Sequence, residues 1–201
     1  MTNPTTSSSP ALSSSGKSGI LDLQEQLGFY RKYHHDTTNV LIHVVFVPTI
    51  LFSTLTLFTR FTLPGLAAYP EINIGTLGAL GYGIFYTLLD VKFGLPSLLV
   101  LVAATLKLSA LKGTGDGVAW LLFVVGWVVQ FIGHGVFEGR APALLDNLVQ
   151  ALVLAPFFVT FEVAHFLGYR REVLDEIDRK IAPELEAFHA AKRGKKAAKA
   201  N

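Results

Sequence analysis

The chain has 201 residues, of which 51% are hydrophobic and 16% charged, and its mean hydropathy is +0.45. Ordinary soluble domains are less apolar, so the composition excludes that class and indicates a membrane protein. The net charge is only +2. The chain has no cysteine, which excludes disulfides and thiolate metal sites. A metal such as iron, manganese or zinc would therefore have to be held by histidine, carboxylate, amide or water.

The N-terminal part of the sequence changes character near residue 20. Residues 1–19 are rich in Ser, Thr, Pro and Gly and are predicted to be a disordered tail. They lack a basic segment followed by an apolar one, so we expect no cleaved signal peptide. Residues Ile20–Tyr33 alternate apolar with polar side chains, which predicts an amphipathic helix on a membrane surface or against the rest of the protein.

Five apolar runs follow, at Leu41–Thr59, Ile72–Leu89, Phe93–Leu106, Gly117–Phe137 and Asn147–Phe161. A membrane span needs about 20 residues, so the first, second and fourth are good candidates, and the third suffices if Lys107 reaches the interface. The fifth is weak, because Pro156 lies inside it and Glu162 follows it. The sequence therefore predicts an all-α integral membrane bundle of four to five apolar helices.

A charged helix is predicted at Glu172–Lys192, with an apolar stripe formed by Val173, Ile177, Ile181 and Leu185. The sequence thus predicts three parts: a tail at residues 1–19, a membrane bundle with the metal site at residues 20–170, and a charged cytosolic helix with a basic tail at residues 171–201. The bundle is thus flanked by amphipathic helices at both ends.

Basic residues predict the orientation of the bundle. Arg31-Lys32 precede the first run and Arg170-Arg171 follow the fifth, which favours a cytosolic location for both termini. An even number of crossings is then required, so we expect the fifth run to bend at Pro156 and return to the cytosolic face. A segment of this kind lines a cavity or is buried in protein, and it would deliver Glu162 and His165 to that cavity.

Three of the six histidines fall within ten residues, at His34, His35 and His43. Asp36 is a suitable N-cap for a helix that would place Asn39 and His43 one turn apart on one face. His34 and His35 would lie in the corner before that helix, from which a side chain can converge with His43. The alternative is a surface histidine pair and one core histidine.

A fourth histidine, His134, lies near the cytosolic end of the fourth run, at the depth of His34 and His43. Gln130, His134 and Glu138 are spaced to share one helix face. Glu138 is either a ligand or an acceptor for an imidazole N–H, and the alternative is an ion pair with Arg140. His165 is more typical of an interfacial packing residue, and His189 receives no role.

Several imidazoles with at most one carboxylate are typical of a non-haem Fe(II) site with open positions for substrate and O₂. The sequence has no phosphate-binding loop or dinucleotide fingerprint, and no Gly-x-Ser-x-Gly elbow of a serine hydrolase. The remaining classes are therefore a metal-dependent membrane enzyme and a membrane lipid-binding protein.

Two motifs carry a resemblance to a known family. The first is Leu-Gly-Phe-Tyr-Arg-Lys-Tyr-His34-His35-Asp-Thr-Thr-Asn39-Val-Leu-Ile-His43 with Pro48 after it, and the second is Gln130-Phe-Ile-Gly-His134 with Glu138 and Pro142 after it. Together they resemble the fungal 2-hydroxy fatty acid dioxygenases, a family named for metabolism of phytosphingosine to odd-numbered fatty acids. The resemblance extends from about Leu21 to Tyr169.

The resemblance implies an enzyme of the endoplasmic reticulum membrane that uses Fe(II) and O₂ to shorten 2-hydroxy fatty acids by one carbon in phytosphingosine breakdown. The family histidines map onto His34, His43 and His134, and His35 matches the fungal form of the motif. We therefore expect His34, His35, His43 and His134 as metal ligands. Glu138 joins His34, His43 and His134 as a catalytic candidate, and the candidates for substrate contacts or support of the ligands are Asn39, Gln130 and Glu162.

The expected partners are a 2-hydroxy fatty acid, O₂ and membrane lipids, without nucleic acid, and the oligomeric state is open. A membrane fatty acid hydroxylase is an alternative, although such enzymes need about eight histidines in clustered boxes and this chain has six. A membrane structural or lipid-binding protein, with hydrogen-bonded core histidines, is the other alternative.

Overall fold

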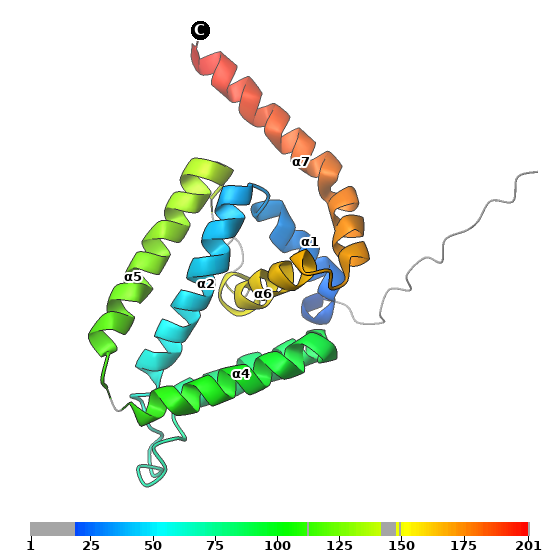
Figure 1. The fold of residues 1–201 in the computed structure, drawn as a ribbon. Coiled ribbons are helices and arrows are strands. Elements are labelled where there is room, and N and C mark those ends of the chain that lie inside the picture. Colours follow the sequence, from blue (N-terminus) through cyan, green and yellow to red (C-terminus); the bar gives the residue numbers. More distant parts are fainter. Residues whose placement is uncertain (1–18, 112, 142–147, 149, 201) are drawn as a thin grey trace, which may run out of the picture.

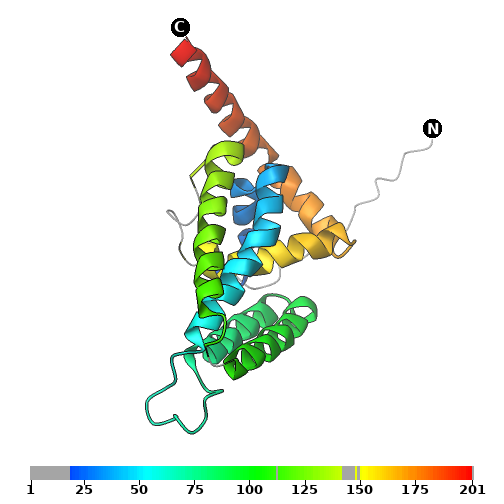
Figure 2. The same ribbon diagram turned by 60° about the vertical axis from the view of Figure 1, so that its left-hand side comes forward.

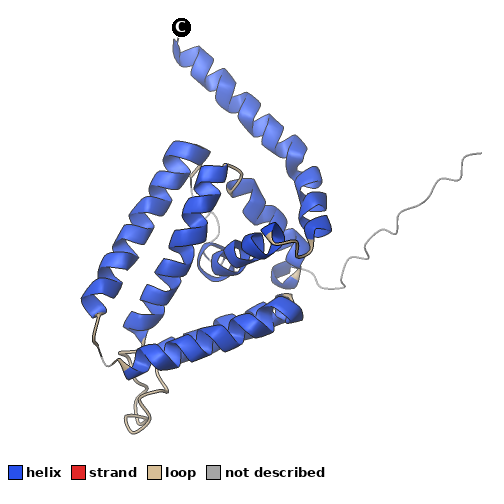
Figure 3. Cartoon of the chain, viewed as in Figure 1, coloured by secondary structure: helices blue, strands red, loops and turns tan. Residues whose placement is uncertain are grey.

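A computed structural model describes residues 19–111, 113–141, 148 and 150–200, and every regular element within them is helical (Figures 1 and 3). The predicted all-α class is therefore confirmed. The predicted N-terminal tail lies outside the described residues, except for Gly19. In chain order the elements are η1 (Gly19–Leu21), α1 (Leu23–Tyr33), α2 (Thr37–Phe58), α3 (Ile74–Leu89), α4 (Val91–Ala110), α5 (Asp116–Ile132), η2 (Gly133–Glu138), η4 (Gln150–Leu154), α6 (Ala155–Phe166) and α7 (Arg171–Ala200), of which η2 and η4 are π-helices.

Helices α2 and α5 form an antiparallel pair that runs through the molecule (Figures 1 and 2). The two helices approach closely at Gly126, where an added Cβ would lie 2.6 Å from the Ile50 Cγ1 atom. Because α2 and α5 run in opposite directions, the start of α2 and the end of α5 lie at the same end of the pair. This end carries the histidines that the sequence singled out.

Helices α3 and α4 form a tight hairpin that lies across one end of the α2–α5 pair at a steep inclination (Figure 2). Gly83 and Gly94 allow the close packing, since a Cβ at Gly94 would lie 2.2 Å from the Tyr86 carbonyl oxygen. Asn73 caps the start of α3 and Asp90 caps the start of α4, which limits α3 to 16 residues. The second predicted span is therefore shorter than the sequence suggested.

Helix α6 forms the centre of the hydrophobic core. Its Phe157, Phe158 and Phe161 side chains are completely buried. Pro156 occupies the first turn of α6, where the missing N–H is tolerated, and the π-helix η4 precedes it. With 12 residues, α6 is shorter than a membrane span. The expected bend at Pro156 is wrong, because the helical segment Ala151–Phe166 continues through that residue and the chain bends by 113° after it, between α6 and α7.

Helices α1 and α7 pack on each other at the side of the bundle (Figure 1). The predicted apolar stripe of α7 is confirmed, because Val173, Ile177, Ile181 and Leu185 are buried. Lys32 of α1 also forms an ion pair with Glu184 of α7, at 2.5 Å.

Three helices in the described part of the chain are long and apolar enough to cross a membrane, at Thr37–Phe58, Val91–Ala110 and Asp116–Glu138. A fourth results if the bent pair Ala151–Phe166 and Arg171–Gly194 is counted as one span. The fold is thus compatible with a multi-pass membrane protein. That the fifth run returns to the face from which it came stays a prediction.

Candidate metal centre and adjoining cavity

The corner between α1 and α2, formed by residues 34–36, holds the first histidine. Asp36 caps α2 as predicted, because its side chain accepts hydrogen bonds from the backbone N–H groups of Thr38 at 2.8 Å and Asn39 at 3.1 Å. His34 ends α1, and its Nδ1 atom lies 2.9 Å from the Tyr30 carbonyl oxygen. That bond makes Nδ1 the protonated nitrogen and leaves the Nε2 lone pair available.

His43 repeats this arrangement two turns into α2. Its Nδ1 atom lies 2.8 Å from the carbonyl oxygen of Asn39, one turn earlier. His34 and His43 are only 5% and 3% exposed. Both imidazoles are therefore fixed in orientation by a backbone carbonyl, as metal-binding histidines commonly are.

His134 completes a cluster with these two residues, which we call the histidine trio. Its ring centroid lies 4.9 Å from that of His34 and 4.8 Å from that of His43, while the His34 and His43 centroids are 4.4 Å apart. One nitrogen from each ring lies within 4.8 Å of the others. The structure thus brings together His34, His43 and His134, as the sequence analysis expected.

The π-helix η2 places His134 against α2. Gly133 fits there because a Cβ would lie 2.6 Å from the Asn39 Oδ1 atom. The wider π turn is closed by Gly139, whose N–H donates to the His134 carbonyl oxygen at 2.8 Å and whose φ is +65°. Single π turns inside α-helices are frequent at functional sites.

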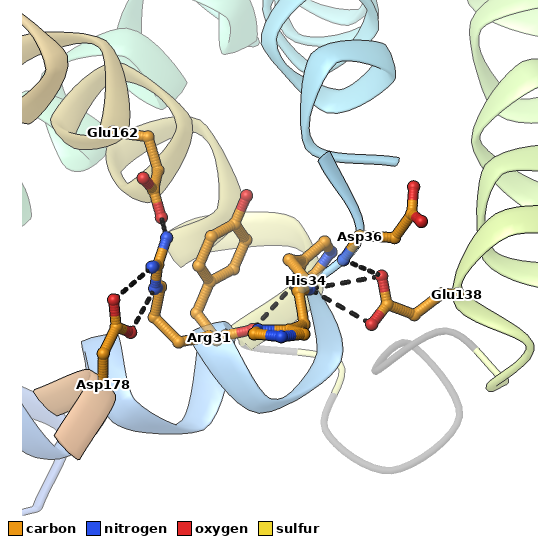
Figure 4. A network of polar contacts seen from close by, with 8 residues as sticks. Arg31, His34, Asp36, Glu138, Glu162 and Asp178 are labelled. Carbon is orange, nitrogen blue, oxygen red and sulfur yellow. Dashed lines mark hydrogen bonds and ion pairs between the residues drawn. The ribbon is translucent and has the colours of Figure 1, made fainter. Parts of the chain in front are cut away.

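Glu138 is buried, but its carboxylate does not belong to the cluster of possible metal ligands that the trio forms. Its carboxylate accepts hydrogen bonds from the backbone N–H groups of His35 at 3.1 Å and Asp36 at 3.0 Å (Figure 4). It also accepts one from the Asn39 side-chain amide at 3.1 Å. The expectation that Glu138 shares one helix face with Gln130 and His134 assumed a continuous α-helix. The π-helix η2 changes the angle between successive side chains, so the α-helical spacing does not hold there. Glu138, the last residue of η2, therefore joins that helix to the corner that carries His34.

The alternative considered for Glu138, an ion pair with Arg140, is not formed. Arg140 donates to the carbonyl oxygen of Lys32 at 3.0 Å, and its guanidinium lies 3.9 Å from the centroid of the Tyr33 ring. Arg140 thus holds the end of α1 instead of neutralising Glu138.

The opposite side of His34 carries an ion-pair network (Figure 4). Arg31 contacts Glu162 of α6 at 2.6 Å and Asp178 of α7 at 2.5 Å. These contacts raise the pKa of Arg31 despite its burial. Glu162, expected near the metal site, is engaged with Arg31 and joins α6 to α1.

The remaining histidines lie outside the trio. His35 is exposed, and its ring faces that of His189 with centroids 6.0 Å apart. The structure does not bring His35 to the trio, because consecutive residues in this extended corner project in different directions. The His165 Nδ1 atom on α6 is buried without a hydrogen-bond partner.

A cavity of about 810 Å³ extends from the trio along α2, with α3, α5 and the start of α6 as its other walls. His43 and Phe58 of α2 both line it, and at 1.5 Å per residue they are about 22 Å apart along the helix. The volume is typical of small-molecule sites, and apart from the trio the walls are mainly apolar. The shape suits a long aliphatic chain with its polar group at the histidines.

Tyr30 and Gln130 line the same cavity. Gln130 was an expected substrate contact, whereas Tyr30 was not singled out, although its position one turn before His34 is visible in the sequence. The Tyr30 ring stacks on the His34 ring with centroids 4.0 Å apart. Burial, with a further contribution from Glu162, raises the pKa of Tyr30, so its hydroxyl stays protonated.

The residues present fit a divalent metal ion. Burial and the neighbouring rings of His43 and His134 lower the pKa of His34 well below its usual range, so this imidazole is neutral. The Nδ1 atom of His134 is buried without a hydrogen-bond partner, an arrangement that a bound ion or its ligands would relieve. Three imidazoles suit iron, zinc or copper.

Comparison with known proteins agrees with this geometry. The family model described as "Mpo1-like: 2-hydroxy-palmitic acid dioxygenase Mpo1-like" matches residues 20–167. The chain is also 46% identical over 152 residues to a Saccharomyces cerevisiae protein named 2-hydroxy-palmitic acid dioxygenase MPO1, and the matched region covers 75% of this chain and 84% of the yeast protein. No solved structure matches the chain.

Proposed function

The chain belongs to the Mpo1-like family, and from this membership we propose that it is an iron-dependent dioxygenase that converts 2-hydroxy fatty acids into fatty acids one carbon shorter. The observation that carries the proposal is the buried histidine trio at one end of a long apolar cavity. A metal held by the trio could bind the polar group of the substrate, and the apolar cavity suits its acyl chain.

The reaction balances without a further reductant. A 2-hydroxy acid and O₂ give the shortened acid, CO₂ and water, because the bond between the carboxyl carbon and C2 breaks and C2 becomes the new carboxyl carbon. The substrate supplies all four electrons that one O₂ accepts. This balance agrees with the absence of a dinucleotide fingerprint from the sequence.

His34, His43 and His134 would hold the iron. When bound, ferrous iron supplies open coordination positions for the 2-hydroxy acid and O₂, and a redox-active centre at which they react. The carbonyl groups of Tyr30 and Asn39 orient two of the imidazoles. Glu138 holds the corner beside them, so it acts as a positioning residue.

The apolar cavity walls contribute binding and selectivity. They remove the acyl chain from water, which stabilises binding by about 0.8 kcal/mol for each buried CH₂ group. They also keep water away from the reacting carbon atoms. A fatty acid without the 2-hydroxyl would make the same chain contacts but would lack two of the electrons, so it should inhibit competitively.

We further place this activity in phytosphingosine breakdown, in the endoplasmic reticulum membrane, with both termini cytosolic. The family resemblance of the two histidine motifs supports the pathway and compartment. Basic residues at the trio end of the bundle, among them Lys32, Arg140 and Lys192, support a cytosolic location for that end.

The proposal is tested with protein purified without oxygen and reconstituted with Fe(II). On addition of 2-hydroxypalmitate and O₂ without NADPH, mass spectrometry should detect pentadecanoate and CO₂. Palmitate should not be shortened and should compete with 2-hydroxypalmitate. Shortening of both acids, or a requirement for NADPH, would contradict the proposed reaction.

A further inference from the structure

The part of the cavity wall that the structure describes offers no charged group for a carboxylate. Among the described residues that line it, none is Lys, Arg, Asp or Glu. Arg31, next to Tyr30 in sequence, is already bound to Glu162 and Asp178. If the proposed function holds, the substrate carboxylate must be held by the metal and by neutral hydrogen-bond donors.

Among the described residues that line the cavity, three carry a hydroxyl group, and two of these hydroxyls already donate to a backbone carbonyl. The Thr54 hydroxyl donates to Ile50 at 2.7 Å, and the Tyr82 hydroxyl donates to Leu152 at 2.9 Å. The Tyr30 hydroxyl is different, because it is buried without a hydrogen-bond partner. A buried donor without an acceptor destabilises the fold unless a ligand accepts its hydrogen bond.

Packing fixes the Tyr30 side chain at the trio end of the cavity. It is 3% exposed, its ring stacks on His34, and the Phe158 ring contacts it with centroids 5.0 Å apart. Because two rings hold it, its hydroxyl has little freedom to find another partner. The position next to His34 is where the polar group of a bound 2-hydroxy acid would lie.

We propose that Tyr30 is a substrate-binding residue whose hydroxyl donates a hydrogen bond to the carboxylate of the 2-hydroxy fatty acid. This rests on the proposed function. A phenol is a neutral donor, and its hydrogen bond to an anion is stronger than one to a neutral acceptor. Tyr30 would thereby orient the carboxylate without bringing a competing charge into the apolar cavity.

The test compares Tyr30→Phe with the wild type as full-length, Fe(II)-loaded protein without oxygen. Trp127 lines the cavity and the chain has only two tryptophans, so tryptophan fluorescence can report binding. Tyr30→Phe should weaken binding of 2-hydroxypalmitate and of palmitate about 10- to 100-fold, the range for loss of a hydrogen bond to a charged group. Iron content should not change, because the ring that packs on His34 remains.

Hexadecane-1,2-diol lacks the carboxylate and provides the ligand control, since the two proteins should bind it equally. Tyr69→Phe provides the protein control, because Tyr69 is exposed in the α2–α3 loop. Equal affinity of Tyr30→Phe and wild type for palmitate would overturn the proposal, as would loss of iron or weaker binding of the diol. Failure of the wild type to turn over 2-hydroxypalmitate would instead contradict the proposed function.

Discussion

At the histidine end of the cavity the three clustered imidazoles are almost completely buried, whereas several other wall residues are exposed apolar side chains. His34, His43 and His134 are each at most 5% exposed. Leu77 of α3 and Leu152 of η4 are 44% and 39% exposed. One end is therefore enclosed by polar contacts of defined geometry, and the other is bounded by side chains on the outer surface of an apolar bundle.

The difference lies in what each end requires of its residues. Hydrogen bonds and metal coordination depend on direction, so a misplaced group at the histidine end loses its function. Apolar contacts depend mainly on buried area, so the far end tolerates changes of shape. We therefore expect substitutions at the two ends to differ in kind as well as in size.

The largest effect should follow from removing one imidazole of the trio. Alanine at His34, His43 or His134 should abolish iron binding and lower activity more than about 100-fold, beyond the effect typical of residues that only support ligands. Iron analysis of the purified variants, together with turnover of 2-hydroxypalmitate, measures this. His189→Ala is the matched control, and full iron with full activity in His134→Ala would remove the basis of the metal site.

A smaller effect should separate the two carboxylates on either side of His34, Glu138 and Glu162. Glu138→Gln keeps the shape but presents an amide to the backbone N–H groups of His35 and Asp36, so iron affinity should fall about 10- to 100-fold. Glu162→Gln should change iron affinity much less, because Glu162 contacts Arg31 and not the corner. Iron titrations of both variants measure the difference, and equal losses would show that the two flanks have the same role.

The far end should respond with a change of selectivity. Gly78 of α3 lines the cavity, so Gly78→Leu should shorten the space for the acyl chain. We expect kcat/KM to fall about 10-fold for 2-hydroxypalmitate, the value of losing roughly two CH₂ contacts, and to stay unchanged for 2-hydroxylaurate. Gly81→Leu is the control on the same helix, because a Cβ there meets nothing within 4 Å. An unchanged chain-length preference in Gly78→Leu would show that the acyl chain does not bind beside Gly78.

The smallest effect is expected for His35→Ala. The exposed ring is removed while the backbone N–H that Glu138 accepts remains. Iron content and turnover should stay within about 2-fold of the wild type, as for other exposed positions without special contacts. Loss of iron in this variant would show that His35 is a metal ligand, as expected from the sequence.

Local patterns in the sequence suffice to locate the trio. The Asp36 cap and the spacing to His43 are properties of adjacent residues, and the antiparallel order of the apolar runs places His134 at the same end. Neither step requires knowledge of side-chain packing. The all-α class follows in the same way, from the lengths and composition of the runs.

Other features depend on contacts between distant residues. The π turn that redirects Glu138 arises from how η2 packs on α2, and no spacing rule for an α-helix predicts it. The partners of Arg31 lie 131 and 147 residues away, so Glu162 could not be assigned to it from the sequence. The sequence likewise shows Tyr30 one turn before His34 but not that its hydroxyl lacks a partner.

The exposed apolar wall residues have a kinetic consequence. Leu77, Phe131 and Leu152 belong both to the cavity wall and to the outer surface, so in a bilayer the cavity would border directly on lipid. A 2-hydroxy fatty acid partitions into that lipid before it meets the protein. The concentration that sets the rate is then its mole fraction among the lipids. Added inert phospholipid should lower the rate at constant bulk substrate, as surface dilution.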